Sequence, residues 1–160
     1  MAILRSAVAL LGFCAVQGNV PLRGIFRIQQ KSSMRYLDAF DSNDSNDYKA
    51  VTRELQSNPS QWWYLARVEG AADNIFTIQK VGTNEGSAQG HFLDAYEDGG
   101  NDWRVVTRTA QNNPSQQWMV TRVGGTNSFT IQQRSNQRFL DAYSGRDWQV
   151  VTRGQELNDS

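Results

Sequence analysis

The chain has 160 residues, and its sixteen lysines and arginines balance its sixteen aspartates and glutamates. A net charge of zero, without any block of like charge, gives no indication of a nucleic-acid groove or of a membrane surface. The single cysteine, Cys14, excludes an internal disulfide, so packing alone must hold the fold.

The first eighteen residues differ in character from the rest of the chain. A short basic start over residues 1–5 is followed by an apolar run over residues 6–16, which is too short to span a bilayer. This order resembles a secretory signal peptide, which would make the mature domain, residues 19–160, a secreted protein. The alternative is that residues 1–18 are retained, in a cytoplasmic protein, as a strand or helix that closes the fold.

From Phe26 onward, one pattern is written three times with a period of about fifty residues. Each copy has a Phe-x-Ile-Gln segment, a Leu-Asp-Ala segment and a segment ending in Val-Thr-Arg. A period of this length is typical of one supersecondary unit that packs against its own copies. We expect repeats over residues 26–75, 76–128 and 129–160.

Alternation of apolar and polar residues predicts strands within each copy. In the second copy, Phe92, Asp94 and Tyr96 fall on one face, and a later strand over residues 118–123 ends at a Gly-Gly pair. Polar, glycine-rich turns separate these segments. Four strands in each of three copies give about twelve short strands, which can close into a barrel and leave no exposed edge.

The third copy lacks its fourth strand. The first two copies contain Gln-x-Trp at Gln61–Trp63 and Gln116–Trp118, whereas the third stops at residues 158–160. We therefore expect a gap in the barrel that exposes backbone groups. Either the apolar stretch 6–16 folds back to fill this gap, or the chain is a truncated version of a longer product.

The Leu-Asp steps at Asp38, Asp94 and Asp141, followed in two copies by Gln-x-Trp about twenty residues later, resemble the ricin-type β-trefoil lectins. The resemblance covers residues 25–160 and implies an all-β, β-trefoil fold. It also implies a carbohydrate-binding lectin module for galactose-type or related glycans, multivalent through repeated sites. Its partners would be glycans or glycoproteins, with no nucleic acid and no membrane span, and its oligomeric state is left open.

The resemblance also implies which residues contact the sugar. In these lectins the Leu-Asp aspartate accepts hydrogen bonds from two sugar hydroxyls, the glutamine of Gln-x-Trp holds that aspartate, and a preceding asparagine donates as well. Carried over to this chain, the implied sites are Asp38 with Asn58 and Gln61, Asp94 with Asn113 and Gln116, and Asp141 with Asn158. The alternative is that these aspartates only anchor turns. Trp63 and Trp118 are expected in the core.

The resemblance also implies an aromatic ring that stacks on the sugar, usually on the third strand of each repeat. At that point this chain has valines instead, namely Val51, Val106 and Val151. An aromatic residue lies two or three positions earlier in every copy: Tyr48, Trp103 and Trp148. These rings either stack on a ligand or cover the end of the barrel, and we favour ligand contact because each follows an aspartate in a polar loop.

Three arginines, Arg53, Arg108 and Arg153, end the same strand in all copies. Each either binds a carboxylate or sulfate on an acidic glycan or pairs with an aspartate of its own repeat, for instance Asp47, Asp102 or Asp147, and we favour the pairing.

The chain offers little for catalysis. His91, its one histidine, occupies the place of an arginine in the other copies, so we predict a strand start there rather than a general base. We expect no enzyme, no cofactor and no metal site. The competing interpretation is a protein-binding β-trefoil, such as a protease inhibitor, that acts through the irregular loop 81–90.

Overall fold

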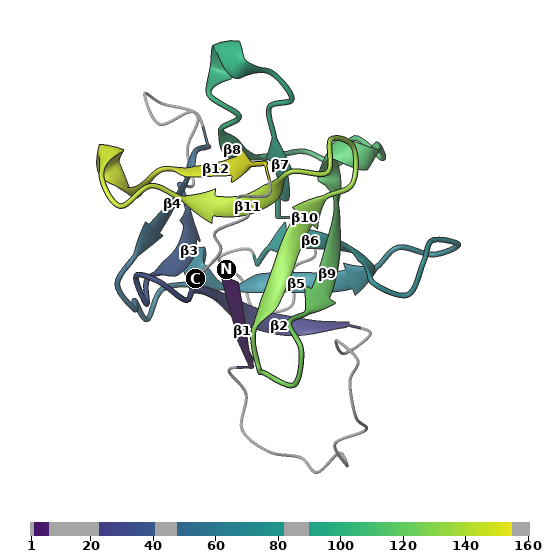
Figure 1. Cartoon of the computed structure of the whole chain (residues 1–160), viewed down its shortest axis with the longest axis horizontal. Coiled ribbons are helices and arrows are strands. Elements are labelled where there is room, and N and C mark those ends of the chain that lie inside the picture. The colour runs from purple at the N-terminus through teal and green to yellow at the C-terminus, as the bar shows by residue number, and fades with distance from the viewer. Residues whose placement is uncertain (1, 7–22, 41–47, 82–89, 155–160) are drawn as a thin grey trace.

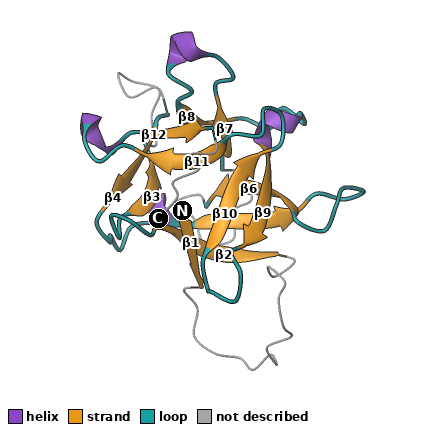
Figure 2. Cartoon of the chain, in the orientation of Figure 1, coloured by secondary structure: helices purple, strands orange, loops and turns teal. Residues whose placement is uncertain are grey.

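A computed structural model describes residues 2–6, 23–40, 48–81 and 90–154. Within these ranges the chain forms twelve strands and four short 3₁₀ turns. The strands are β1 (Ala2–Ser6), β2 (Arg23–Gln30), β3 (Tyr36–Ala39), β4 (Ala50–Arg53), β5 (Trp63–Arg67), β6 (Ile75–Lys80), β7 (Phe92–Ala95), β8 (Val105–Arg108), β9 (Gln117–Arg122), β10 (Phe129–Gln133), β11 (Phe139–Ala142) and β12 (Val150–Arg153). The turns are η1 (Pro59–Gln61), η2 (Gly99–Asn101), η3 (Pro114–Gln116) and η4 (Arg146–Trp148), and they lie in the loops that connect the strands (Figure 2).

Six of the strands close into an antiparallel barrel. Strand β2 pairs with β5, β5 with β6, β6 with β9, β9 with β10, β10 with β1, and β1 again with β2 (Figure 1). The ring returns to its first strand, so its backbone groups pair around the barrel.

The other six strands form three hairpins at one end of the barrel. These are β3–β4, β7–β8 and β11–β12, and each joins the barrel through β2, β6 or β10. The hairpins touch one another through single bridges, such as Lys49 with Val106 and Arg104 with Val151. A six-stranded barrel closed by three hairpins is the β-trefoil, so the expected fold class is confirmed.

Strand β1 takes the barrel position that was expected to be vacant. It lies between β10 and β2, as β5 lies between β2 and β6, and β9 between β6 and β10. Its register against β2 runs from Ala2 opposite Gln30 to Ser6 opposite Phe26. The pairing involves residues 2–6, and of the predicted stretch 6–16 all but residue 6 lie outside the described residues.

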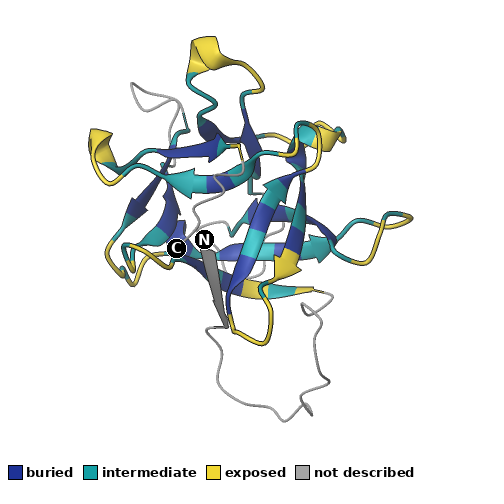
Figure 3. Ribbon diagram, viewed as in Figure 1, coloured by how far each residue is buried: buried dark blue, intermediate teal, exposed yellow. Residues whose placement is uncertain are grey.

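Large apolar side chains form the core, and the buried residues lie along the strands (Figure 3). Trp63 and Trp118 are fully buried, as expected. Their indole Nε1–H groups donate to the backbone oxygens of Leu37 and Leu93, each at 3.0 Å. Because these acceptors belong to the Leu-Asp strands, each tryptophan fixes the strand that carries the adjacent aspartate.

Candidate functional site

The Leu-Asp aspartate of the second repeat is buried under its own chain. Asp94 on β7 has no exposed surface. Its Oδ1 accepts from the backbone N–H of Ala95 at 2.7 Å, and its Oδ2 accepts from Arg108 Nη1 at 3.2 Å and Gln116 Nε2 at 3.4 Å. With both oxygens engaged and covered, this carboxylate meets a sugar hydroxyl only after Arg108 has moved.

Arg108 contacts an aromatic ring as well as the carboxylate. Its guanidinium carbon lies 4.4 Å from the ring centroid of Tyr96, the residue that follows the Leu-Asp-Ala strand. The Arg108 side chain is 29% exposed, so one part of it faces solvent while another part pairs with Asp94. Tyr96 was predicted as a strand residue but not as a site residue, although an aromatic residue follows Leu-Asp-Ala in every copy.

The other two repeats have the same three-part contact. Arg53 lies 3.7 Å from Asp38 and 4.6 Å from the ring centroid of Phe40. Arg153 lies 2.9 Å from Asp141 and 4.5 Å from the ring centroid of Tyr143. In each repeat, the arginine that ends β4, β8 or β12 therefore pairs with the Leu-Asp aspartate of the same repeat.

The predicted pairing of each arginine with an aspartate of its own repeat is confirmed, but the partners of Arg108 and Arg153 are not the aspartates given as examples. The strand register places Asp94 opposite Val106, two residues before Arg108, so Arg108 and Asp94 are diagonal neighbours on one face of the hairpin. Asp102, the predicted partner of Arg108, instead contacts Arg146 at 3.3 Å across the repeat boundary. Likewise Arg153 pairs with Asp141 rather than with Asp147. Asp47 lies outside the described residues.

The glutamines of Gln-x-Trp link each aspartate to the preceding loop. Gln61 Nε2 donates to Asp38 Oδ2 at 3.2 Å and to the Glu54 backbone oxygen at 2.8 Å, and its Oε1 accepts from the Gln56 backbone N–H at 2.9 Å. Gln116 repeats this arrangement around Asp94. Both glutamines are buried, so they act as positioning residues.

The asparagines do not reach the aspartates. Asn113 Nδ2 donates to Gln111 Oε1 at 3.1 Å, and Asn113 Oδ1 accepts from Ser115 Oγ at 2.7 Å. Asn58 makes the matching contacts in the first repeat. Asn113 lines an open hollow of about 510 Å³ together with Tyr96, Arg108, Gln111 and Ser115. Asp94 lies beneath this hollow and not in its lining.

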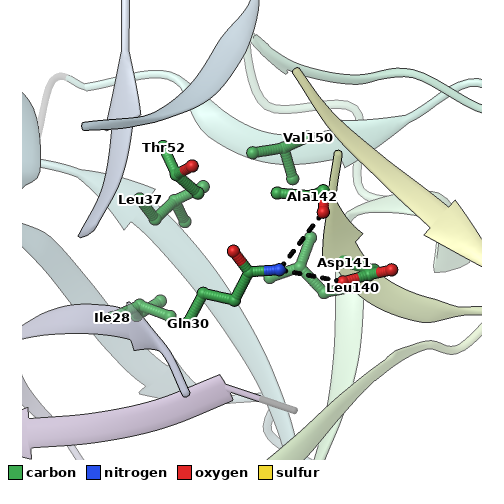
Figure 4. Close-up of a pocket in the computed structure, with 8 residues that line it drawn as sticks. All are labelled: Ile28, Gln30, Leu37, Thr52, Leu140, Asp141, Ala142 and Val150. Carbon is green, nitrogen blue, oxygen red and sulfur yellow. Dashed lines mark hydrogen bonds between the residues drawn. The ribbon is translucent and has the colours of Figure 1, made fainter. Parts of the chain in front are cut away.

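The third repeat differs because its aspartate accepts a hydrogen bond from a side-chain amide of the first repeat. Gln30, at the end of β2, donates to Asp141 Oδ1 at 3.0 Å and to the Ala142 backbone oxygen at 3.2 Å (Figure 4). A small cavity of about 20 Å³ lies beside this contact, and its lining includes Ile28 and Leu140. The Asp141 side chain is 32% exposed, unlike its two counterparts. Asn158 lies outside the described residues.

A lysine occupies the place of Gln30 in the second repeat. Burial lowers the pKa of the Lys80 ammonium group, and attraction to Asp38 partly opposes this shift. Asp38 therefore lies near two cations, Lys80 and Arg53.

The three candidate stacking rings lie at the contacts between repeats. Tyr48 packs on His91 with ring centroids 4.5 Å apart, while Arg138 lies 3.8 Å from the Trp103 ring and Arg35 lies 4.2 Å from the Trp148 ring. All three of these residues have a positive backbone φ angle, between 50° and 59°. At the junction of the first and second repeats, His91 lies against the ring where an arginine lies at the other two junctions.

The described residues contain no group of three or more histidine, cysteine, aspartate or glutamate side chains that could hold a metal ion. Within the same ranges, no helix is long and apolar enough to cross a membrane.

Fold and site together define a β-trefoil with an Asp–Arg–aromatic contact in each repeat. Residues 84–153 match the family model described as "Ricin-type beta-trefoil lectin domain-like", which confirms the resemblance expected from the sequence. No curated protein matches the chain.

Solved structures show the same fold at low sequence identity. A designed threefold-symmetric protein, ThreeFoil, aligns with a TM-score of 0.66 and 16% identity over 84% of this chain and 91% of its own. A Polyporus squamosus lectin, bound to a human-type influenza-binding epitope, gives a TM-score of 0.67 and 16% identity over 91% of this chain. An exo-β-1,3-galactanase from Clostridium thermocellum gives 0.62 and 20% over 92% of this chain. The chain spans 47% of the lectin and 29% of the galactanase.

Proposed function

We propose that the protein is a carbohydrate-binding module and that the hollow of the second repeat, beside Arg108 and Asn113, holds a sugar. The ricin-type match over residues 84–153 includes this whole repeat site. The observation that supports this is the hollow itself, whose lining includes one guanidinium, one carboxylate, two side-chain amides, two serine hydroxyls and one tyrosine. Groups that both donate and accept hydrogen bonds suit a ring of hydroxyls.

The sugar contacts Arg108 rather than Asp94 in this proposal. Removing Arg108 from a buried carboxylate costs several kcal/mol, whereas each hydrogen bond in a solvent-facing hollow returns only about 1 kcal/mol. A ligand that makes few such bonds therefore leaves the ion pair in place. Asp94 and Gln116 position Arg108, and Arg108 and Asn113 offer hydrogen bonds to the sugar oxygens.

The first and third repeats supply further copies of the site. In the first, Phe40, Arg53 and Asn58 correspond to Tyr96, Arg108 and Asn113. In the third, Tyr143 and Arg153 correspond to the first two of these. Several weak sites on one rigid body gain avidity on a multivalent glycan. Galactose-type glycans are the ligands to test first.

The proposal is for binding without catalysis. The likeness to part of a galactanase is compatible with this, because a chain spanning 29% of that enzyme matches one section of a longer protein. Secretion through residues 1–18 stays a prediction, and so does the alternative function through loop 81–90, since residues 82–89 lie outside the described residues.

A glycan array tests the proposal, with the full-length chain as probe and free galactose and lactose as competitors. We expect binding that a free sugar displaces. Asn113→Ala should weaken it roughly fivefold to tenfold, the loss of about one hydrogen bond. Asn127→Ala, at an exposed asparagine in another loop, is the matched control and should change nothing. Silence across the array from folded protein would contradict the proposal and favour loop 81–90.

A further inference from the structure

A second hollow, of about 310 Å³, lies where the second and third repeats meet. Its lining includes two arginines, Arg138 and Arg153, two aromatic residues, Trp103 and Tyr143, and one carboxylate, Asp102. Apart from Asp102 and Trp103, these residues belong to the third repeat. The hollow is thus formed only when the repeats pack together.

Arg138 is held in one orientation within this hollow. Its Nε and Nη2 donate to the Thr152 backbone oxygen at 3.2 and 2.8 Å, and its guanidinium lies over the Trp103 ring. Burial, and secondarily the positive charge of Arg153, lower the pKa of Arg138. The two guanidiniums are therefore close enough to repel one another, which favours an anion between them.

The charges around the hollow leave one cation unbalanced. Asp141 pairs with Arg153, and Asp102 lies 3.3 Å from Arg146. Asp102 also accepts from the Tyr143 hydroxyl at 3.2 Å. Among the described residues, no carboxylate forms an ion pair with Arg138. Counted over the described residues only, Arg138, Arg146 and Arg153 lie with two carboxylates, Asp102 and Asp141, and Arg138 is the guanidinium that neither carboxylate pairs with.

We propose that this hollow binds an acidic sugar residue, with its carboxylate or sulfate on Arg138 and its ring beside Trp103 and Tyr143. The inference rests on the proposed carbohydrate binding and names the ligand class of a further site. A planar guanidinium suits the oxygens of a carboxylate or sulfate, because two parallel N–H groups can meet two oxygens. The Thr152 carbonyl has already fixed the guanidinium, so less conformational entropy is lost on binding.

The junctions between the other repeats provide an internal comparison. Between the third and first repeats, Arg35 lies over Trp148 and donates to the Thr52 backbone oxygen, as Arg138 does with Trp103 and Thr152. Between the first and second repeats, His91 takes this place. The arginine arrangement therefore occurs at two junctions out of three, whereas the aspartate-bound arginines occur in every repeat.

The experiment is a titration of the full-length protein with galacturonate and, separately, with galactose, which differ only at C6. The reporter is the indole N–H resonance of Trp103, assigned with Trp103→Phe. We expect galacturonate to shift this resonance and to bind roughly fivefold to tenfold more tightly than galactose, as one charge-assisted hydrogen-bonded contact allows. Galactose 6-sulfate forms a third arm that separates carboxylate from sulfate recognition.

Two variants with opposite expected effects distinguish recognition from damage to the fold. Arg138→Gln removes the cation and should reduce galacturonate binding to the level of galactose, while Arg122→Gln, at an exposed arginine on β9, should not. Asp102→Asn removes a repelling charge and should tighten galacturonate binding roughly twofold to threefold. Asn suits this position, because Asp102 has a φ of 54° and asparagine tolerates the left-handed region.

Equal affinity for galacturonate, galactose 6-sulfate and galactose would overturn the inference while leaving the proposed function intact. A Trp103 resonance that stays fixed while the acid binds would also overturn it, because the ligand would then lie elsewhere. Weaker galacturonate binding by Asp102→Asn would do the same. A folded protein that binds no glycan at all would instead reject the proposed function, and this inference with it.

Discussion

Arg108 Nη1 lies 3.2 Å from Asp94 Oδ2, and the carboxylate has no exposed surface while the arginine side chain is 29% exposed. The aspartate of the Leu-Asp pattern thus points into the protein and presents an arginine to solvent. The same relation holds between Arg53 and Asp38, whereas in the third repeat Arg153 pairs with Asp141 although the side chain of Asp141 is itself 32% exposed. The Leu-Asp aspartate therefore positions an arginine, and we propose that this arginine binds the sugar.

Replacing Asp94 with asparagine tests the structural half of this account. Asp94→Asn keeps the shape of the side chain but leaves Arg108 without its counter-charge. We expect the free energy of unfolding to fall by about 2–3 kcal/mol, as for other partly buried ion pairs that lose one partner. Urea denaturation measures the change. An unchanged midpoint and slope would contradict the burial of this pair.

Replacing Gln116 with alanine tests the link between the aspartate and its loop. The change removes hydrogen bonds to Asp94, to the Thr109 backbone oxygen and from the Gln111 backbone N–H. We expect a loss of about 2–3 kcal/mol of unfolding free energy, because buried partners are left unsatisfied. Gln117→Ala, at the next and more exposed residue, should stay within about 0.5 kcal/mol of the parent protein. Equal effects of the two changes would refute the assigned role of Gln116.

Replacing His91 with arginine tests the contacts between repeats. Arg35 and Arg138 each donate to a threonine backbone oxygen of their own repeat and lie over a ring of the preceding one. By the same geometry, His91→Arg should reach the Thr107 oxygen and the Tyr48 ring. We expect stabilisation of about 0.5–1 kcal/mol, typical of an exposed cation–π contact. A lower melting temperature would show that the second junction has a different geometry.

Deleting residues 2–6 tests the closure of the barrel by β1. The deletion leaves one barrel edge of β2 and of β10 unpaired. We expect the cooperative thermal transition to be lost or to move to a markedly lower temperature. A synthetic peptide of residues 1–8 added to the shortened chain should restore it. A transition unaffected by the deletion would mean that β1 contributes nothing to stability.

Local pattern predicted much of the fold, because alternation and repetition are visible in sequence. The strands that contain Phe76, Leu93 and Trp118 follow from apolar spacing, and three copies of them imply a closed trefoil. The buried glutamines, Gln61 and Gln116, follow from the family resemblance. These features depend on short-range order or on a motif that keeps its spacing.

The features that escaped prediction depend on register between distant strands. Pairing of Arg108 with Asp94 requires knowing which residues face one another in the β7–β8 hairpin, and the sequence suggested Asp102 instead. The contact of Trp103 with Arg138 joins two repeats and leaves no local signal. Closure of the barrel by Ala2–Ser6 is likewise a non-local pairing. The prediction fell on residues 6–16 because that run is longer and more apolar.

The most direct test of the central claim is a nitrogen-15 chemical-shift titration of the full-length protein with the sugar that binds best on the array. We expect backbone amide shifts to centre on the hollow of the second repeat, at Tyr96, Arg108, Asn113 and Ser115. Asp94→Asn should weaken this binding, because the carboxylate holds Arg108 in position. A folded protein whose amides do not shift with any sugar, or an Asp94→Asn variant that stays folded and binds as the parent does, would contradict the central claim.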